Sequence, residues 1–252
     1  CRLQKGIVYM QLFYTPDHAR VGDVIPYYEN GEFKLFYLKN WNPYFGSDKT
    51  YGWHLLTTKD LIHYESETAI GILGGTGCII KVEGLYHLYY CVFEDQPQRQ
   101  YVCHATSTDL TNWTKYPDET FGPDESIYLL TDWRDPHVIW NEEEKCWWMI
   151  LCAQNQGNTK RRGCVGLCKS ADLHHWTCCE PLYAPQSSMS AYECPDLFYM
   201  NGWWYLVFSQ FTDRFQTLYR MSRSCNGPWI RPKTDSFDGR AFYAAKTCSD
   251  GE

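Results

Sequence analysis

Two stretches of the sequence place charged residues at the start of an apolar run. WRDPHVIW sets Arg134 and Asp135 directly ahead of Pro136, and YECPDLFYM sets Glu193 ahead of a second such run. Proline has no backbone donor, so Pro136 suits the first residue of a strand and the charges then stand at the mouth of that strand. Burying a charge without a partner is costly. The Arg134–Asp135 pair is therefore either a structural ion pair or part of a polar binding site.

Carboxylates gathered at one place have a specific chemistry. Two carboxylates that flank a bond are the usual equipment for glycoside cleavage. One is ionised, to attack or to stabilise, and the other is protonated, to donate to the leaving oxygen. Crowding like charges raises the pKa of at least one of them, which supplies an acid near neutral pH. Whether the carboxylates meet depends on the elements that position them.

The chain is a repeat with a period of about 50 to 60 residues. Each unit reads as an apolar strand, a tight turn, a more aromatic strand, a third strand that ends in a polar corner, and a short fourth strand. Hairpins are expected over residues 23–40, 77–95, 135–154 and 194–210, where turns such as MNG carry the Asn-Gly signal. In the corners an Asp can hydrogen-bond the backbone two residues on. Asp60, Asp109 and Asp172 are therefore expected to be structural, as are His174 and His175 beside the last of them.

Four short strands per unit are the pattern of a propeller blade. The predicted fold is all-β, a five-bladed β-propeller of four-stranded antiparallel blades, with residues 1–252 forming one catalytic domain. The fifth unit opens with RAFYAAKT at 240–247. We therefore expect the fifth blade to be truncated and the protein to continue beyond Glu252; a following β-sandwich domain is a candidate for the missing part. A β-sandwich or an open sheet stack would explain the hairpins but not the period.

In a propeller the first strand of each blade lines the central channel, so the starts of the units face one mouth. These starts are Gly22-Asp23, Gly75-Thr76, Arg134-Asp135 and Glu193-Cys194. Three carboxylates, from Asp23, Asp135 and Glu193, are thus expected to converge with Arg134 beside them.

The composition of the chain limits the classes of molecule that it is expected to bind. The net charge is −7 and no long basic run occurs, which argues against nucleic acid. No apolar stretch approaches the roughly 20 residues that span a bilayer, so no membrane partner is expected. The 20 Tyr and 11 Trp are residues that commonly form the stacking surface of a polar pocket. The expected partner is a carbohydrate substrate, on the grounds of the carboxylates described above. The oligomeric state is not indicated.

The thirteen cysteines lie scattered through apolar runs and form no CxxC. Cys164 and Cys168 come closest to that pattern, but a zinc site needs four ligands and no second pair accompanies them. The start of the chain does not resemble a secretory signal. We therefore expect reduced, buried cysteines, a cytoplasmic location, and neither a metal nor another cofactor; disulfides or a metal site are the alternative.

Several of these motifs resemble those of glycoside hydrolase family 32, the invertase- and fructanase-like enzymes with a five-bladed propeller. WRDPHVIW, YECPDLFYM and GGTG are similar to the family's Arg-Asp-Pro, Glu-Cys-Pro and Ser-Gly-Ser-type motifs, and FYAAKT to its Phe-Tyr-Ala-Ala-Gln segment. The resemblance implies a retaining enzyme that cleaves β-fructofuranosidic bonds in sucrose, fructo-oligosaccharides or fructans.

The resemblance also implies a role for each residue at the mouth. Asp23 would be the nucleophile that forms a covalent fructosyl-enzyme, and Glu193 would be the acid and then the base. Asp135 would bind sugar hydroxyls and stabilise the transition state, while Arg134 keeps Asp135 ionised and donates to the substrate. Further substrate-binding candidates are Thr76, Cys194, Trp53 (in YGWHLLTT, where core packing is the alternative) and Trp41 (in the loop NWNPYFG).

The chain departs from the family around its first carboxylate. The family's Trp-Met-Asn-Asp-Pro-Asn-Gly is replaced by RVGDVIP at 20–26, and a family Gln is replaced by Leu38. This indicates a divergent branch with an altered sugar subsite. The alternatives are an inverting α-L-arabinofuranosidase or β-xylosidase of a related five-bladed family, and a non-catalytic sugar-binding propeller, which would not need Glu193 as an acid.

Overall fold

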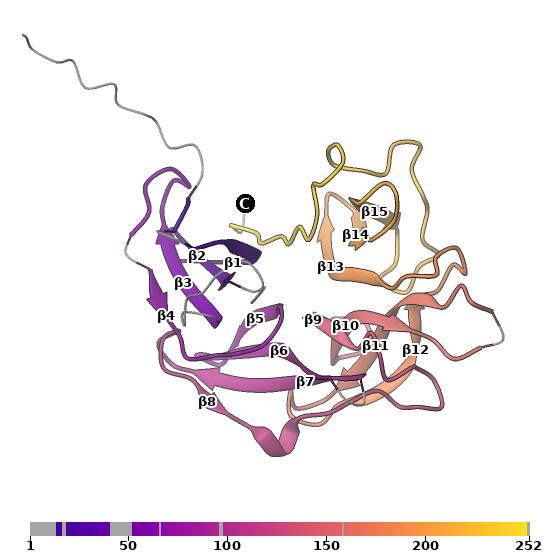
Figure 1. Ribbon diagram of the computed structural model, residues 1–252, viewed down its shortest axis with the longest axis horizontal. Coiled ribbons are helices and arrows are strands. Elements are labelled where there is room, and N and C mark those ends of the chain that lie inside the picture. Colours follow the sequence, from indigo (N-terminus) through magenta and orange to yellow (C-terminus); the bar gives the residue numbers. More distant parts are fainter. Residues whose placement is uncertain are drawn as a thin grey trace, which may run out of the picture.

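The computed structural model describes residues 14–16, 19–40, 52–65, 67–95, 98–157 and 159–250. Figure 1 shows four sheets placed around a common centre, which is the arrangement of a propeller. The described residues contain no α-helix, and η2 (Pro117–Glu119) is a single 3₁₀ turn. The all-β propeller prediction is confirmed. Within the described part of the chain, no helix has the length and apolar character needed to cross a membrane.

The sheets follow one another along the chain, and all their strand pairs are antiparallel. The first sheet consists of β1 (Val21–Glu29), β2 (Glu32–Lys39), β3 (Gly52–Thr58) and β4 (Thr68–Ala69). The second consists of β5 (Gly77–Val82), β6 (Leu85–Asp95), β7 (Gln98–Ser107) and β8 (Thr114–Lys115). The third consists of β9 (Arg134–Asn141), β10 (Cys146–Gln154), β11 (Gly163–Ser170) and β12 (Thr177–Tyr183). The fourth consists of β13 (Tyr192–Met200), β14 (Trp203–Gln210) and β15 (Gln216–Ser222).

Each expected hairpin is present, and its turn chemistry explains its register. In the first sheet Asn30 and Gly31 connect β1 to β2 with φ values of 54° and 79°. In the fourth, Asn201 and Gly202 connect β13 to β14 with φ values of 51° and 81°. Two consecutive positive φ values match the twist of the flanking strands, and Asn-Gly adopts them at low cost.

The polar corners are built as expected from aspartate hydrogen bonds. Asp60 Oδ1 accepts from the backbone of Ile62 at 2.9 Å. Asp109 and Asp172 accept in the same way from the residues two positions on, each at 2.9 Å. Each corner thus closes without a partner strand. These three carboxylates have structural roles.

The structure differs from the sequence prediction in the last unit. The fourth sheet has three strands, and its expected fourth strand is reduced to two isolated bridges, Met221 to Ile230 and Leu218 to Ser236. Pro228 and Pro232 flank Ile230 and cannot donate to a ladder. Residues 240–250 are not in a strand; they run from beside the fourth sheet toward β1 (Figure 1).

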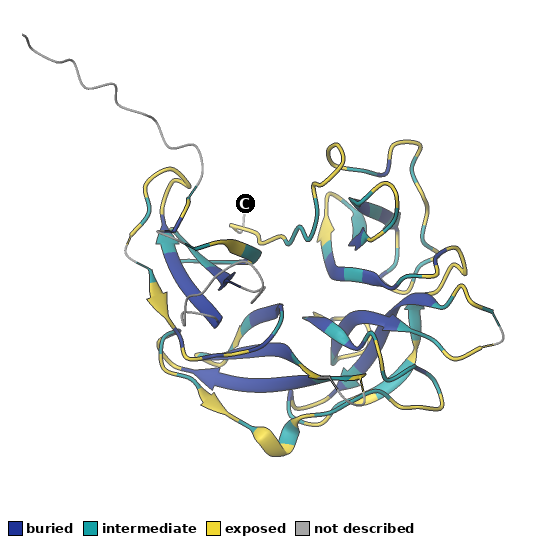
Figure 2. Ribbon diagram, viewed as in Figure 1, coloured by how far each residue is buried: buried dark blue, intermediate teal, exposed yellow. Residues whose placement is uncertain are grey.

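Apolar side chains fill the space between neighbouring sheets, and the sheets are buried where they face each other (Figure 2). Phe36 of β2 and Leu88 of β6 belong to the cluster between the first two sheets. Tyr89 and Met149 belong to the next cluster, and Trp148 belongs to the one between the third and fourth sheets. Close packing of this kind resists small displacements, so it fixes the angle between blades and thereby the positions of the strand mouths.

Candidate active site

The first strands of three sheets carry the same backbone distortion at their mouths. The pairing registers of β1, β9 and β13 each shift at this point. The residue after the shift begins has a positive φ in each case: Asp23 at 43°, Asp135 at 58° and Cys194 at 48°. A bulge re-aims a side chain, and bulges are common next to active sites. The three positions are therefore structurally equivalent, as the sequence alignment of the units predicted.

These mouths open onto one cavity of about 620 Å³. All three expected carboxylates, Asp23, Asp135 and Glu193, line it together with Arg134. The other lining residues are Leu38, Gly74, Gly75, Thr76, Phe93, Gln100, Cys194, Phe211, Phe215, Tyr243 and Ala244. The convergence that the repeat predicted is present in the structure.

Arg134 ties two of the carboxylates together from the third blade. Its Nη2 donates to Glu193 Oε1 at 2.5 Å, and its Nε lies 3.8 Å from Asp135 Oδ2. On the other side its Nη1 donates to Asp132, which also accepts from Gln154, and to Gln100 Oε1 at 3.3 Å. A guanidinium held by several acceptors is fixed in orientation, so Arg134 sets the position of Glu193.

Asp135 is the most enclosed of the three carboxylates, with 6% of its side chain exposed. Its Oδ2 accepts a hydrogen bond from the backbone N–H of Cys194 at 2.9 Å. This bond joins the mouths of β9 and β13 directly. Cys194 therefore contributes its backbone to the site, and its buried thiol lines the cavity.

The surroundings of Asp23 raise the pKa of its carboxyl. Burial, which is the largest cause, and the negative charges of Asp135 and Glu193 raise the pKa of its carboxyl from 3.8 to about 6. Lys246 and Arg134 act in the opposite direction. Asp23 is therefore ionised at neutral pH but takes up a proton in mild acid.

We expect the raised pKa of Asp23 to set the acid limb of the pH profile of kcat/KM. If Asp23 acts as the ionised nucleophile, kcat/KM falls as the pH drops through about 6, because the protonated form cannot attack. Replacing Lys246 with Met removes a charge that lowers the pKa of Asp23, so the limb should move to higher pH. Initial rates from pH 4 to 8 measure both. An acid limb that stays in place in Lys246→Met would contradict the assignment.

Three of the expected site residues remain: Thr76, Trp53 and Trp41. Thr76 lines the cavity, and its buried Oγ1 has no hydrogen-bond partner among the described residues, so it is available to a ligand. Trp53 lies in the core at 1% exposure and does not line the cavity, so it cannot stack on a sugar; its indole donates to the carbonyl of Gly75 at 3.1 Å and holds that segment. Trp41 lies outside the described residues.

The glycines before Thr76 are required by close packing. A Cβ on Gly75 would meet the sulfur of Cys91 at 2.6 Å, and one on Gly74 would meet the carbonyl oxygen of Cys91 at 2.5 Å. The glycines of the GGTG stretch thus let this segment lie directly against β6 of its own sheet.

Sequence reasoning missed the contribution of the C-terminal segment. Tyr243 donates to Glu193 Oε2 and stacks on Phe215 with ring centroids 4.2 Å apart. Burial and the hydrogen bond to Glu193 raise the pKa of Tyr243, so its hydroxyl stays protonated. Lys246 donates to the carbonyl of Pro195 at 3.0 Å. The signal available in the sequence was FYAAKT, which we interpreted as a strand rather than as part of the mouth.

Removing the hydroxyl of Tyr243 should slow catalysis without unfolding the site. Tyr243→Phe keeps the stacking on Phe215 but deprives Glu193 of one of its two side-chain donors. We expect kcat to fall about tenfold with KM little changed, since one hydrogen bond to a charged group is lost. Steady-state kinetics measure this. Tyr219→Phe, whose hydroxyl donates to the carbonyl of Thr234, is the control and should match the unmodified protein.

The sequence of this chain is similar to those of known proteins. The glycosyl hydrolases family 32 N-terminal domain model matches residues 24–252. The chain belongs to glycosyl hydrolases family 32. Among family 32 relatives, the levanbiose-producing levanase of Bacillus subtilis (strain 168) is 26% identical over 258 residues, covering 93% of this chain and 45% of the levanase. The family 32 chain spans about half the length of the curated relatives it matches.

Solved structures agree on the fold of this family 32 chain. A family 32 β-fructofuranosidase from Bombyx mori superposes with a TM-score of 0.66 at 22% identity, over 87% of this chain and 51% of that one. The xylan β-1,4-xylosidase from Bacillus halodurans C-125 superposes with a TM-score of 0.63 at 15% identity, over 88% and 44%. At these identities the likeness shows the fold alone, so membership of family 32 rests on the sequence match.

Proposed function

We propose that this chain is the catalytic propeller of a retaining β-fructofuranosidase that cleaves fructans, fructo-oligosaccharides or sucrose. The observation that carries the proposal is the meeting of Asp23, Asp135, Glu193 and Arg134 at one cavity in a family 32 chain. Independent structural ion pairs would not fall at the same position of three blades.

In the first step, Asp23 attacks the anomeric carbon of the fructosyl unit while Glu193 gives its proton to the glycosidic oxygen. The bond to the leaving group breaks and a covalent fructosyl-enzyme forms. In the second step, Glu193 takes a proton from water, the water attacks the same carbon, and Asp23 is released. Neither step requires a metal ion.

The neighbouring groups support both protonation states of Glu193. Arg134 and Tyr243 donate to the carboxylate as found in the structure. A hydroxyl can also accept, so Tyr243 can rotate to receive a hydrogen bond from the protonated form. Asp135, fixed by the backbone of Cys194, is available to accept from sugar hydroxyls as positive charge develops on the ring.

Aromatic side chains at the rim favour a sugar ligand. Phe93 and Phe211 line the cavity with 50% and 61% of their surface exposed, and Phe215 lies beside Phe211 with ring centroids 5.3 Å apart. Exposed aromatic faces provide the stacking surface that sugar rings use. They replace Trp53 in the role that the sequence suggested for it.

The test is to incubate the full-length protein with levan, short fructo-oligosaccharides, sucrose and aryl arabinofuranosides, and to follow the released sugars by NMR. Fructose released first as its β-anomer supports the proposal. Arabinose or xylose released with inverted configuration would move the chain to the inverting alternative. Sugar binding without turnover would identify a binding propeller.

The cysteines favour a reducing compartment for this enzyme. Eight of the twelve described cysteines are buried and none of the twelve is in a disulfide. Burial raises the pKa of the thiols of Cys78 and Cys164 to about 12, which leaves them unreactive. A cytoplasmic location follows as part of the proposal, and fractionation of the cells that make the protein tests it.

A further inference from the structure

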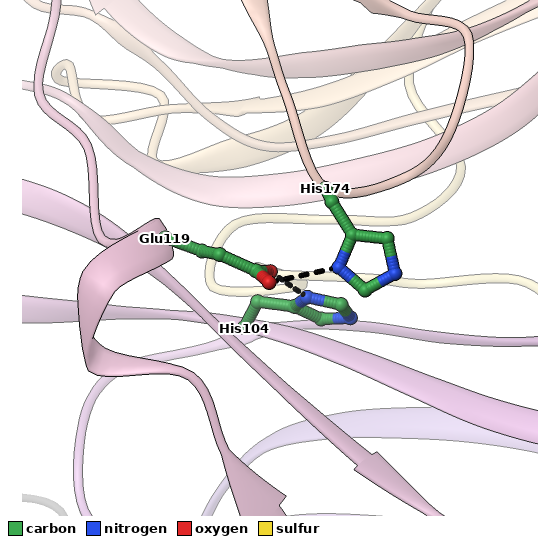
Figure 3. Close-up of side chains that lie close together, drawn as sticks. All are labelled: His104, Glu119 and His174. Carbon is green, nitrogen blue, oxygen red and sulfur yellow. Dashed lines mark hydrogen bonds and ion pairs between the residues drawn. The ribbon is translucent and has the colours of Figure 1, made fainter.

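Three side chains outside the cavity have the chemistry and the spacing of a metal site. They are His104 on β7, Glu119 in η2, and His174 in the corner between β11 and β12. One ligand atom from each lies within 4.8 Å of the other two. Figure 3 shows both histidine rings directed at the carboxylate of Glu119. His104 Nδ1 lies 2.6 Å from Oε2, and His174 Nδ1 lies 2.8 Å from Oε1.

We propose that His104, Glu119 and His174 bind one divalent transition metal ion, zinc above all, and that this ion joins the second blade to the third. Two imidazoles and a carboxylate suit zinc, whereas calcium and magnesium prefer oxygen ligands alone. Tetrahedral zinc with bonds of about 2.1 Å holds its ligand atoms about 3.4 Å apart. The two histidine nitrogens lie 2.6 Å and 2.8 Å from the carboxylate oxygens, which is closer than that value, so the side chains have to rotate slightly apart to admit the ion.

The rings are already held in place for such a site. His104 is 3% exposed and stacks on Tyr89 and Tyr116, with ring centroids 4.6 Å and 5.1 Å away. Its Nε2 lies 3.0 Å from Nδ1 of the buried His87. For Nδ1 to bind an ion, the ring proton must be on Nε2, and His87 is placed to accept it. Metal-binding histidines ordinarily have a partner of this kind for their second nitrogen.

The cluster has room for a fourth ligand. The side chains of Glu119 and His174 are 20% and 36% exposed, so water can complete the coordination. None of the three residues lines the cavity at the strand mouths, and the inference does not depend on the proposed glycosidase activity. Sequence reasoning grouped His174 with the structural corner residues because its partners lie in the preceding blade.

The test uses the full chain, treated with a chelator and titrated with zinc by calorimetry. We expect one equivalent to bind, and His174→Ala and Glu119→Gln to weaken binding by at least about 100-fold because each removes a ligand. His175→Ala is the matched control: it lies in the same corner, is 88% exposed and contacts Asp172 instead. It should bind zinc as the unmodified chain does.

Two further measurements are needed. One distinguishes metal bound at this site from metal bound by cysteines, and the other distinguishes metal binding by these side chains from a merely structural role. Cobalt bound in place of zinc should show no thiolate charge-transfer band. Zinc at a hundredfold excess over Kd should raise Tm by about 5 to 10 °C in the unmodified chain and in His175→Ala, but not in His174→Ala. Absence of binding, a thiolate band, or equal binding by His174→Ala and Glu119→Gln would overturn the proposal.

Discussion

Replacing Glu193 with Gln should lower kcat on sucrose or fructo-oligosaccharides by about 10³-fold. The amide keeps the size of the side chain and can still accept from Arg134, so the mouth stays assembled. What it cannot do is give a proton to the glycosidic oxygen or take one from water. General acid–base catalysis is worth about 10² to 10⁴ in rate, and both chemical steps use the same residue.

Substrates with different leaving groups distinguish a role of Glu193 in proton transfer from a merely structural role. In an aryl fructoside made from an acidic phenol, the phenolate leaves without needing a proton. Glu193→Gln should therefore still release the phenol in a burst and then turn over slowly. Rapid-quench kinetics measure the burst. Glu142→Gln, in the exposed turn between β9 and β10, is the control and should behave as the unmodified protein. An equal loss on both kinds of substrate, with no burst, would refute the assignment.

Replacing Asp23 with Asn should abolish turnover and stabilise the protein in the same variant. Removal of a nucleophile costs about 10⁴-fold or more. The stability gain follows from the raised pKa. The folded state binds a proton at Asp23 more tightly than the unfolded state does, so the free energy of unfolding falls as the pH rises from about 4 to about 6. Above that range Asp23 destabilises the fold by about 1 to 3 kcal/mol, which Asn removes.

Urea unfolding at two pH values checks this prediction. At pH 7 the Asp23→Asn variant should be more stable than the unmodified chain. At pH 4, close to the unfolded-state pKa of 3.8, the difference should be much smaller, because the folded state of both proteins then carries a neutral side chain at position 23. Asp118→Asn, an exposed position in η2, should show no gain at either pH. If Asp23→Asn is less stable than the unmodified chain at pH 7, the buried carboxylate is not strained in the way we infer.

The repeat and the mouth positions could be predicted from the sequence for a physical reason. Strand alternation, Asn-Gly turns and Asp corners are local signals, and each unit shows them within a few residues. Once the period was known, the equivalence of Asp23, Asp135 and the Glu193–Cys194 pair followed from counting. The structure adds that all three are bulges with a positive φ.

The rest depends on contacts that no local pattern reports. The network around Arg134 joins Asp132 in the loop before β9, Gln154 of β10 and Gln100 of β7, and the packing of the second blade on the third brings Gln100 to the others. Tyr243 and Lys246 reach the mouth because their segment runs along it instead of pairing as a strand. Trp53 has a residue type that can stack on a sugar, but its side chain lies in the core. Core packing is the alternative that the sequence left open for this residue.

The left-handed backbone at the strand mouths limits how this site can change over time. Only Gly, Asn and Asp adopt such a conformation readily, and β-branched residues resist it. At position 23 the accessible replacements for the aspartate are therefore small or polar, and none of them fills the cavity. A descendant that lost the carboxylate of Asp23, the nucleophile we propose, would keep the cavity with Arg134 at its wall. The backbone geometry thus leaves a short mutational path from enzyme to sugar receptor, and the same short path back.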